Sequence, residues 1–469
     1  MRVPGWLIAI IALVVGWIVM IPATSSAEEL SLQQALREAT GAHPSIEQAE
    51  QDRRIAENNK KNARTDFFPS LSVSASAQYW NDEITFNTGG GGGDIGQLPP
   101  PENPYQQIVA DAFVNVEPTT IREQFTWDTT LTLTQPLTPL WSIAEAYRAA
   151  KLGEKSAEQQ LSAAERQQAQ EAAVGYFRVL QAKSNLQTAQ QSVEQLKSQA
   201  DRVRALVEAG SAQRQQKLRI EVALANARQE VSRAKSDLKM ARSNLAVTLG
   251  RSPDDDVTVQ DVSSAGMPGM EGELDEKLDA AMKRRPELRR LELESRRAET
   301  ATDATRGQFL PQLVGLAQYK HTAGQGLTGQ DTLFVGASLE WDFLQWGRRF
   351  FEVDSSQARR VKVESSLTQT RRQLRLQVRQ AWYDLEASLE SYRVAERAVA
   401  QAEEAYRVES ARFKAGKATP TELLDAQSAL TEAKNNRNAA RYQTLINHTK
   451  LTYATGRPLT SRDLLGGNS

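Results

Sequence analysis

Two carboxylates, Glu422 and Asp425, stand three residues apart at the start of a predicted helix over residues 421–454. Because residues three apart share one face of an α-helix, both side chains can point in the same direction. Like charges held this close repel each other and attract cations. A structural role is the alternative for Glu422, since residues 419–422, Thr-Pro-Thr-Glu, match a capping box with proline at the first helical position. Asp425 lies beyond that motif.

Outside this pair, the sequence contains no residue group typical of catalysis or of cofactor binding. The chain has no cysteine, which excludes disulfides, thiolate metal sites and cysteine nucleophiles. Its three histidines, His43, His321 and His448, are far apart in sequence. The glycine run at 89–93 lacks the lysine and hydroxyl residue of a phosphate-binding loop. The net charge of −1 gives no indication of nucleic-acid binding. We therefore expect no enzyme activity, no cofactor, no metal site and no nucleic-acid partner.

The first 27 residues are typical of a secretory signal peptide. Arg2 precedes an apolar run over 6–21, and the small residues at 25–27 provide a cleavage site after Ala27. An uncleaved anchor helix is the alternative, but the run is shorter than the roughly 20 residues that a membrane span needs. No later stretch is apolar enough for a membrane helix, so we expect any membrane crossing to use β-strands.

The rest of the chain contains two copies of one unit. Pro69 recurs 242 residues later as Pro311, and further along a spacing of 206 residues relates Gly210 to Gly416. The first copy therefore has 36 extra residues, which lie within 81–125 and are rich in glycine and proline, as in an exposed loop. We divide the chain into a signal peptide (1–27), a first structural repeat (28–250), a linker (251–272), a second structural repeat (273–457) and a C-terminal tail (458–469).

Each copy passes from helix to strand at a Phe-x-Pro sequence. Phe67 and Pro69 form this joint in the first copy, and Phe309 and Pro311 form it in the second. Proline ends the helix, and the alternation of apolar and polar residues after it predicts strands. The predicted strands cover 69–80, 126–137, 311–321 and 331–343. Ten or so residues at about 3.3 Å each, tilted, span a bilayer core of roughly 25 Å.

Two very long helices are predicted over about 143–208 and 348–414, each on the order of 100 Å long. Both contain apolar residues at a seven-residue spacing, which predicts left-handed coiled-coil packing. We expect the return helices at 217–248 and 421–454 to be the partners of these seams. Gly210 and Gly416 are then helix C-caps. The seam residues are Leu186, Ala189, Val193, Leu196, Ala200, Val203 and Val207 in the first helix, and Leu385, Tyr392, Ala395, Val399, Ala402, Tyr406 and Phe413 in the second.

Four strands cannot close a membrane barrel, for which about eight is the smallest usual number. A lone sheet in lipid would leave the polar groups of its edges unpaired. We therefore expect a mainly α fold with a small β part, in which a homotrimer shares a 12-stranded β-barrel joined to an α-barrel of long coiled-coil helices. The alternatives are a soluble sandwich or barrel for the strands and a soluble coiled coil for the helices. Residues expected to line water are Ser72, Ser74, Ser76, Gln78, Thr130, Thr132 and Thr134, and those expected in an aromatic girdle are Tyr79, Trp80, Trp127, Tyr319 and Trp341.

These features, in this order, resemble the TolC-like outer-membrane efflux protein family over nearly the whole mature chain. The resemblance rests on the duplication, the helix starts at His43-Pro44 and Arg285-Pro286, the Phe-x-Pro joints and the glycine tips. The stretches AGKATPTELLDAQSALTEAKNN and YQTLINHTKLTYATG look especially like the second tip and return helix of that family.

The resemblance implies a trimeric channel-tunnel located in the outer membrane and extending into the periplasm. Its implied partners are outer-membrane lipid, a periplasmic adaptor (membrane fusion) protein and an inner-membrane pump of RND, ABC or MFS type. Such a complex would be the exit duct of a tripartite efflux pump or type I secretion system. The tips, Gly210, Ser211, Gly416 and Lys417, would contact the adaptor. Glu422 and Asp425 would ring the closed periplasmic mouth.

The first tip differs from the second because Arg214, Lys217 and Arg219 make it basic. These residues form either a solvated face or a set of partners for the neighbouring acidic tip in the closed mouth. Two other functions compete with the duct. A periplasmic structural coiled-coil protein without a pore predicts a soluble chain without strands. A periplasmic hydrolase predicts a cluster of acid, base and nucleophile, which the sequence does not contain.

Overall fold

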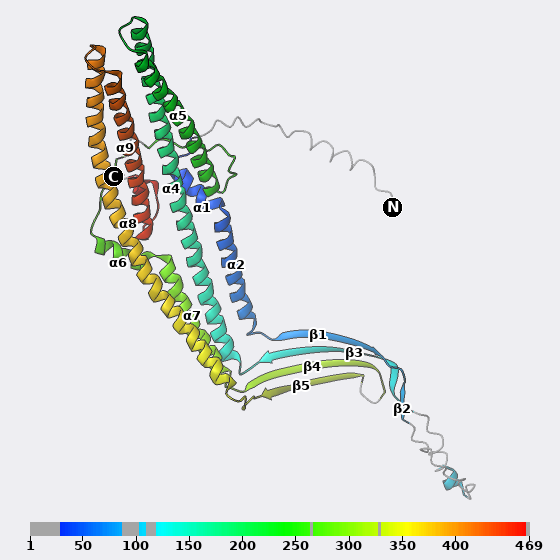
Figure 1. Ribbon diagram of the computed structural model, residues 1–469. Helices are drawn as coiled ribbons and strands as arrows, with labels where there is room; N and C mark the ends of the chain where they lie inside the picture. Colours follow the sequence, from blue (N-terminus) through cyan, green and yellow to red (C-terminus); the bar gives the residue numbers. More distant parts are fainter. Residues whose placement is uncertain (1–28, 87–102, 109–118, 263–265, 327–329, 466–469) are drawn as a thin grey trace, which may run out of the picture. The chain divides into compact units, whose positions relative to one another are not determined.

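The computed structural model describes residues 29–86, 103–108, 119–262, 266–326 and 330–465 of the chain (Figure 1). The predicted signal peptide and most of the insert at 81–125 lie outside these residues. The chain divides into two compact units. The sheet unit comprises residues 49–161 and 286–372, and the helical unit comprises residues 1–48, 162–285 and 373–469. Each unit therefore holds segments of both predicted repeats.

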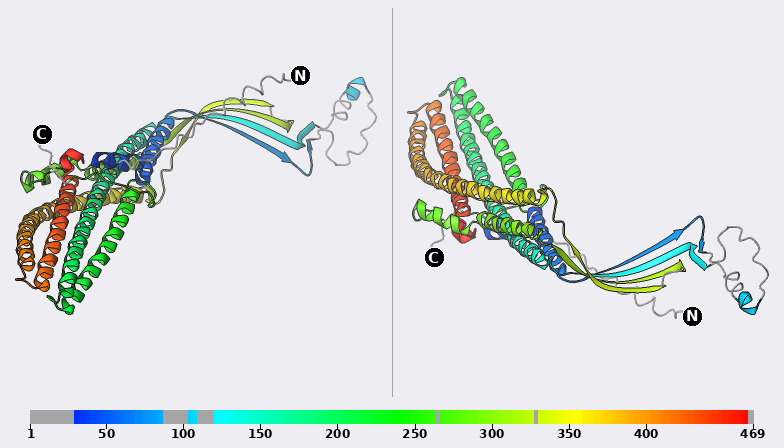
Figure 2. Two further views of the ribbon diagram at one scale, coloured as in Figure 1. Left: turned by 90° about the horizontal axis from the view of Figure 1, so that it is seen from above. Right: turned by 90° about the horizontal axis from the view of Figure 1, so that it is seen from below.

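The sheet unit contains one antiparallel sheet with the strand order β1-β3-β4-β5 (Figures 1 and 2). The four long strands match the predicted ones closely. A short fifth strand, β2, pairs with the extended start of β3, so part of the predicted loop at 81–125 is strand instead. The strands are β1 (Ser70–Tyr79), β2 (Ile84–Phe86), β3 (Thr119–Pro136), β4 (Gln312–Gln325) and β5 (Asp331–Glu340).

At both Phe-x-Pro sequences a helix passes into a strand, and proline sets where the helix ends. The helix α2 (Pro44–Thr65) ends four residues before Pro69, and α7 (Pro286–Gly307) ends four residues before Pro311. A proline ring clashes with the carbonyl of the residue four positions earlier, so the helix cannot continue past that residue. The chain then makes one turn and enters β1 or β4.

Hydrogen bonds fix these joints to the segment between β3 and the next helix. The Gln135 side chain donates to the carbonyl of Phe67 at 3.3 Å. The Thr138 hydroxyl donates to the carbonyl of Pro311 and accepts from the N–H of Leu313, both at 2.7 Å. The direction in which each strand leaves its helix is therefore determined by contacts within the sheet unit.

Two helical hairpins dominate the helical unit. The long helices α4 (Leu140–Glu208) and α8 (Arg348–Lys414) each lead to a glycine turn and a return helix, α5 (Arg214–Thr248) or α9 (Pro420–Ala454). Figure 1 shows α5 beside α4 and α9 beside α8. The predicted seam residues are buried or half-buried, among them Val203 and Leu385. Figure 1 also labels the shorter helices α1 (Leu32–Ala42) and α6 (Leu274–Arg284).

The core of the helical unit extends beyond the predicted seams. Tyr176 and Phe177 of α4 pack against α1, the end of α5 and the far half of α9. The predicted linker contributes Val257 and Val259 to this core, where Val259 bridges to Leu30 in a parallel pair. The predicted tail also contributes, since it contains a short helix, α10 (Ser461–Leu464), that buries Leu464.

Candidate functional site

The two glycine tips have the same backbone geometry. Gly210 and Gly416 have φ angles of +72° and +70°. In each, the N–H of the following residue returns to a carbonyl five positions earlier, from Ser211 to Leu206 and from Lys417 to Arg412, both at 2.8 Å. This is a Schellman cap, whose left-handed residue glycine adopts without strain. No atom lies within 4 Å of where a Cβ would be, so backbone conformation and not packing selects glycine.

Side chains from both long helices and both return helices meet behind these tips. Val203 of α4, Ile220 of α5, Phe413 of α8 and Leu423 of α9 belong to one buried cluster. The Gln199 amide also donates to the Tyr406 hydroxyl at 3.1 Å, joining α4 to α8. The seams therefore have more partners than the return helices, because each long helix also contacts the other. The tips of the two repeats are brought together by this cluster.

Glu422 forms the capping box that the sequence predicted. Its carboxylate accepts the Thr419 N–H at 2.6 Å and the Thr419 hydroxyl at 2.9 Å. These hydrogen bonds, with a smaller contribution from Arg412, hold the pKa of the Glu422 carboxyl below its ordinary value of 4.5. The side chain is nevertheless exposed, so capping does not remove its charge from the surface.

Asp425 is exposed one turn further along α9. Within the described residues, no donor lies at hydrogen-bonding distance from its carboxylate. The Asp425 carboxylate is therefore free of hydrogen bonds within the described residues and can interact with a cation or a partner at the tip. The two acids share a helix face as predicted, but only Asp425 carries a charge without a local structural role.

The basic first tip reaches the start of α9 through one arginine. The Arg219 guanidinium donates to the Thr421 hydroxyl at 3.1 Å, beside Glu422. This contact joins the basic tip to the acidic one within a single chain, although the acceptor is a hydroxyl and not a carboxylate. Among the described residues, no carboxylate lies at ion-pair distance from Arg214 or Lys217.

The sheet has two chemically different faces. Ser72 lies opposite Thr132 and Ser74 opposite Thr130, so the predicted polar rows lie on one face. Val73 and Leu333 belong to the other face, where they are 68% and 75% exposed. Apolar side chains on a strand are stable when another surface or lipid covers them. The apolar face is therefore incomplete without an environment that this single chain does not supply.

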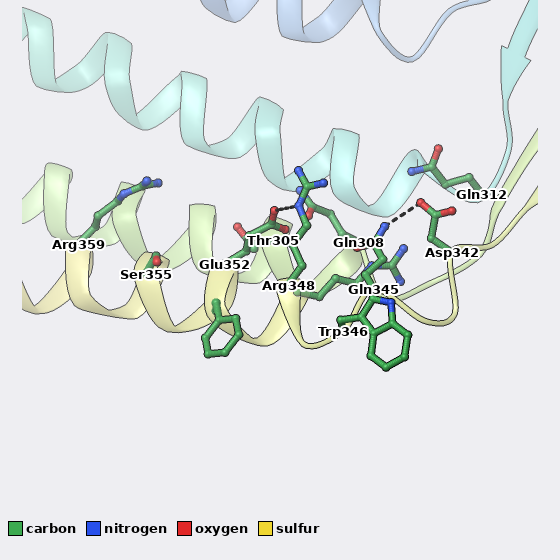
Figure 3. A pocket seen from close by; sticks show the side chains of 12 residues that line it. Thr305, Gln308, Gln312, Asp342, Gln345, Trp346, Arg348, Glu352, Ser355 and Arg359 are labelled. Carbon is green, nitrogen blue, oxygen red and sulfur yellow. Dashed lines mark hydrogen bonds and ion pairs between the residues drawn. The ribbon is translucent and has the colours of Figure 1, made fainter.

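A pocket that the sequence analysis did not predict lies between the end of α7 and the start of α8, with a volume of about 930 Å³ (Figure 3). Both of its carboxylates are engaged. Arg348 donates to Glu352 at 2.9 Å, and Gln345 donates to Asp342 at 2.8 Å. The sequence feature that could have indicated this pocket is the run FLQWGRRFF at 343–351, which mixes aromatic and basic residues directly after a strand.

The described part of the chain contains no cluster of three His, Asp or Glu side chains able to hold a metal ion. None of the described helices is long and apolar enough to cross a membrane.

A family described as "Outer membrane efflux protein" matches residues 35–251 and 278–457 of the chain. A curated relative, "Outer membrane protein TolC" of Salmonella enteritidis, is 30% identical over 135 residues, which are 29% of this chain and 27% of the relative. The sequence match thus spans about a quarter of that protein.

Solved structures match over most of the chain. The outer-membrane channel OprN has a TM-score of 0.72 at 18% identity, covering 91% of this chain and 90% of that one. The outer membrane protein VceC of Vibrio cholerae has a TM-score of 0.71 at 16% identity, covering 91% of this chain and 96% of that one. The MtrE outer membrane channel of Neisseria gonorrhoeae, in its open state, has a TM-score of 0.72 at 18% identity. The match covers 91% of this chain and 89% of that one. At these identities the likeness establishes a common fold.

Proposed function

The chain belongs to the outer membrane efflux protein family, and from this premise we propose that three copies of it form an export channel through the outer membrane. Membership of the family gives the chain an outer-membrane location with a periplasmic extension and confirms the resemblance drawn from the sequence. The mainly helical fold with a small sheet is also as predicted. In the proposal, the channel is the exit duct of a tripartite efflux pump or type I secretion system.

The observation that carries this proposal is a sheet with two exposed faces and two open edges. Within the described residues, β1 pairs only with β3, and β5 pairs only with β4. Unpaired edges in lipid cost several kcal/mol per polar group, so they need partner strands. Three copies joined edge to edge supply twelve long strands, place the serine and threonine rows on the inside and turn Val73 and Leu333 toward lipid.

The helices also offer surfaces for neighbouring copies. Large apolar side chains remain exposed on α5 and on α8 although both helices pack on one side. Long amphipathic helices that expose apolar residues on a second face are typical of bundles completed by other chains. Those exposed are Leu218, Val222, Met240 and Val247 on α5, and Phe350, Phe351, Val361, Leu376, Tyr383, Val394 and Val408 on α8.

The tips are the proposed periplasmic end of the channel. Glu422 and Asp425 from three chains would give six carboxylates around a narrow mouth, which repel one another and attract cations. The exposed turns at Gly210-Ser211 and Gly416-Lys417 would contact a periplasmic adaptor protein, which connects the channel to an inner-membrane pump of RND, ABC or MFS type. The rigid Schellman caps support this role because they fix the shape of the surface that a partner meets.

The test combines mass and conductance. Full-length protein, solubilised in detergent, should have the mass of three copies, and should form ion-conducting pores in planar bilayers. A stable monomer that conducts would overturn the trimer. A three-copy complex that never conducts would instead favour the alternative, a periplasmic coiled-coil protein without a pore. No observation in the described residues favours a hydrolase.

A further inference from the structure

The polar face of the sheet carries two opposite charges near one end. Asp128 on β3 and Lys320 on β4 belong to the face that also presents Ser74 and Thr130. Both lie toward the end of the strands that is far from the Phe-x-Pro joints, which is the extracellular end in the proposed channel. β3 and β4 are the inner strands of the order β1-β3-β4-β5 (Figures 1 and 2), so edge-to-edge pairing with a neighbouring copy leaves both charges uncovered.

The Asp128 carboxylate links three neighbouring strands. One of its oxygens lies 3.8 Å from the Lys320 ammonium, and the other accepts a hydrogen bond from the Ser76 hydroxyl on β1 at 2.8 Å. The Asp128 and Lys320 side chains remain 32% and 41% exposed, so both charges can act on ions in the water beside this face. Arg122, the one cation on β3, lies beyond a register shift and stacks on the Trp80 ring at 3.9 Å.

One further charged side chain belongs to the polar face in the described rows that pair without a register shift. It is Glu340, which lies eight residues along β5 from Thr332, the residue opposite Lys320. Eight strand residues span about 26 Å, whereas electrostatic screening acts over about 8 Å at physiological ionic strength. Glu340 is therefore too far away to balance Lys320, and Asp128 is the carboxylate that balances it.

The architecture of the sheet does not explain this pair. An ion pair between partly exposed side chains adds little to stability. The spacings of the duplication relate Lys320 to Gln78 and Asp128 to Phe334, which are both uncharged. The equivalent strands of the same sheet therefore form without a charge at either position. What the pair changes is the electrostatic field beside the polar face.

We propose that Asp128 and Lys320 determine the charge selectivity of the extracellular part of the lumen, because each cancels the field of the other. Three copies would place three such pairs at one level of the barrel. While the pairs are intact, they favour neither anionic nor cationic solutes. Loss of either partner would leave a ring of three like charges, which is how pores select for ions of one sign. The inference rests on the proposed trimeric channel and concerns which solutes it releases.

Reversal potentials of the full-length channel in planar bilayers, measured across a KCl gradient at low ionic strength, test this inference. All channels compared carry Glu422→Gln and Asp425→Asn, which remove the proposed carboxylates of the mouth. Adding Asp128→Asn leaves three lysines unpaired and should shift the reversal potential toward that of chloride. Adding Lys320→Gln leaves three aspartates unpaired and should shift it toward that of potassium. Adding both changes should restore the starting value.

Two controls separate charge from structure. The shifts should shrink at about 1 M salt, where the screening length is only about 3 Å, whereas a change of shape would persist. Asp331→Asn makes the same charge change at the same end of the sheet but on the apolar face, where Asp331 lies opposite His321, and it should not move the reversal potential. Asp128→Asn keeps the size of the side chain and an oxygen able to accept from Ser76.

Three outcomes would overturn the proposal: single variants without a shift, a double variant that keeps the shift of one single variant, and an equal shift for Asp331→Asn. If Asp128→Asn does not assemble, Lys320→Gln decides alone, since it removes a partly exposed lysine and should fold. A parent that conducts while the variants show no shift refutes only this inference, whereas a parent that forms no pores refutes the proposed function.

Discussion

At the residue scale, Glu422 and Asp425 differ in how much of their charge the chain already uses. Glu422 accepts two hydrogen bonds from Thr419, whereas Asp425 accepts none from the described residues. Both can contribute to a ring of carboxylates at the mouth, but only Glu422 also stabilises the start of α9. Substitutions that keep shape and remove charge can therefore separate the gate from the cap.

We predict that the double variant Glu422→Gln, Asp425→Asn loses block by multivalent cations while its open pore still conducts. A trivalent cation added on the periplasmic side of a planar bilayer should block the parent, and the block should weaken by about tenfold or more when the carboxylates are removed. Asp425→Asn alone should account for much of this change and should leave thermal stability unaltered. Block of equal strength in the double variant would place the gate elsewhere.

His448 gives the helical unit a predicted sensitivity to mild acid. Burial lowers the pKa of His448 from its ordinary value of 6.5, and Glu271, Lys277 and Arg457 are the charged groups near it. Its Nδ1 has no partner among the described residues. Because the pKa is lower in the folded state, the unfolded chain takes up the proton first as the pH falls. Stability is therefore unaffected above about pH 6.5 and decreases below it.

Thermal melts followed by circular dichroism between pH 8 and pH 5 would measure this effect. The melting temperature of the parent should fall in the acidic half of this range, and His448→Gln should show a smaller fall. His43→Gln, a second histidine variant at the start of α2, should keep the fall of the parent. Identical pH profiles for the parent and His448→Gln would refute the assignment.

At the scale of elements, the tip cluster determines whether the two hairpins act as one body. Phe413 contributes the aromatic ring among its buried members, so Phe413→Ala should destabilise the tips by about 3–5 kcal/mol. Local opening would expose the lysines and arginines of the tips to trypsin, and cleavage there should be faster than in the parent. Val408→Ala, on the same helix but 39% exposed, should change the cleavage rate little. Equal rates for Phe413→Ala and the parent would contradict the cluster's role.

The long elements were predictable because local chemistry determines their ends. The Thr419 capping box, the glycine caps and the Phe-x-Pro joints fix helix boundaries within a few residues, and the heptads identify the buried faces. What sequence patterns missed depends on contacts between distant segments. The short strand β2 pairs with the extended start of β3, and Val259 pairs with Leu30 and is buried in a core made by several helices. No local periodicity signals either contact.

The candidate site also has residues that local chemistry predicts and residues that depend on contacts between distant segments. The tip glycines and acids were predictable from their residue types, since φ preference and capping are local properties. The pocket between α7 and α8 was not, because its lining residues come together only when these two helices lie side by side. Its arginines alone, on a helix rich in ion pairs, would have been assigned to a solvated surface.

At the scale of the whole molecule, strand polarity permits closure between copies. Neighbouring strands in the order β1-β3-β4-β5 are antiparallel, so β1 and β5 run in opposite directions. The β1 edge of one copy can therefore continue the sheet at the β5 edge of the next with the same antiparallel pairing. An even number of long strands per copy preserves this alternation around a closed ring. Copies of one chain can therefore close a barrel in which every pair of neighbouring long strands is antiparallel.

Because the chain has no cysteine, edge-to-edge pairing can be tested by disulfide formation without background. One cysteine is placed on β1, at Ser72, Ser74 or Ser76, and one on β5, at Thr332 or Phe334. The observed register places all five positions on the polar face. At least one pair should bring its Cβ atoms within bonding range in neighbouring copies. Mild oxidation should then give linked products of two and three chains on a denaturing gel.

The ladder should end at three chains, because a closed ring of three has only three β1–β5 contacts. The matched control pairs Ser74→Cys with Val335→Cys, which lies on the opposite face and should not form a disulfide. Products of four or more chains would indicate an open sheet, since a closed three-copy ring has no free edge left to extend. A ladder that ends at two would indicate a dimer with eight long strands, and no product from any pair would show that the edges of β1 and β5 do not meet.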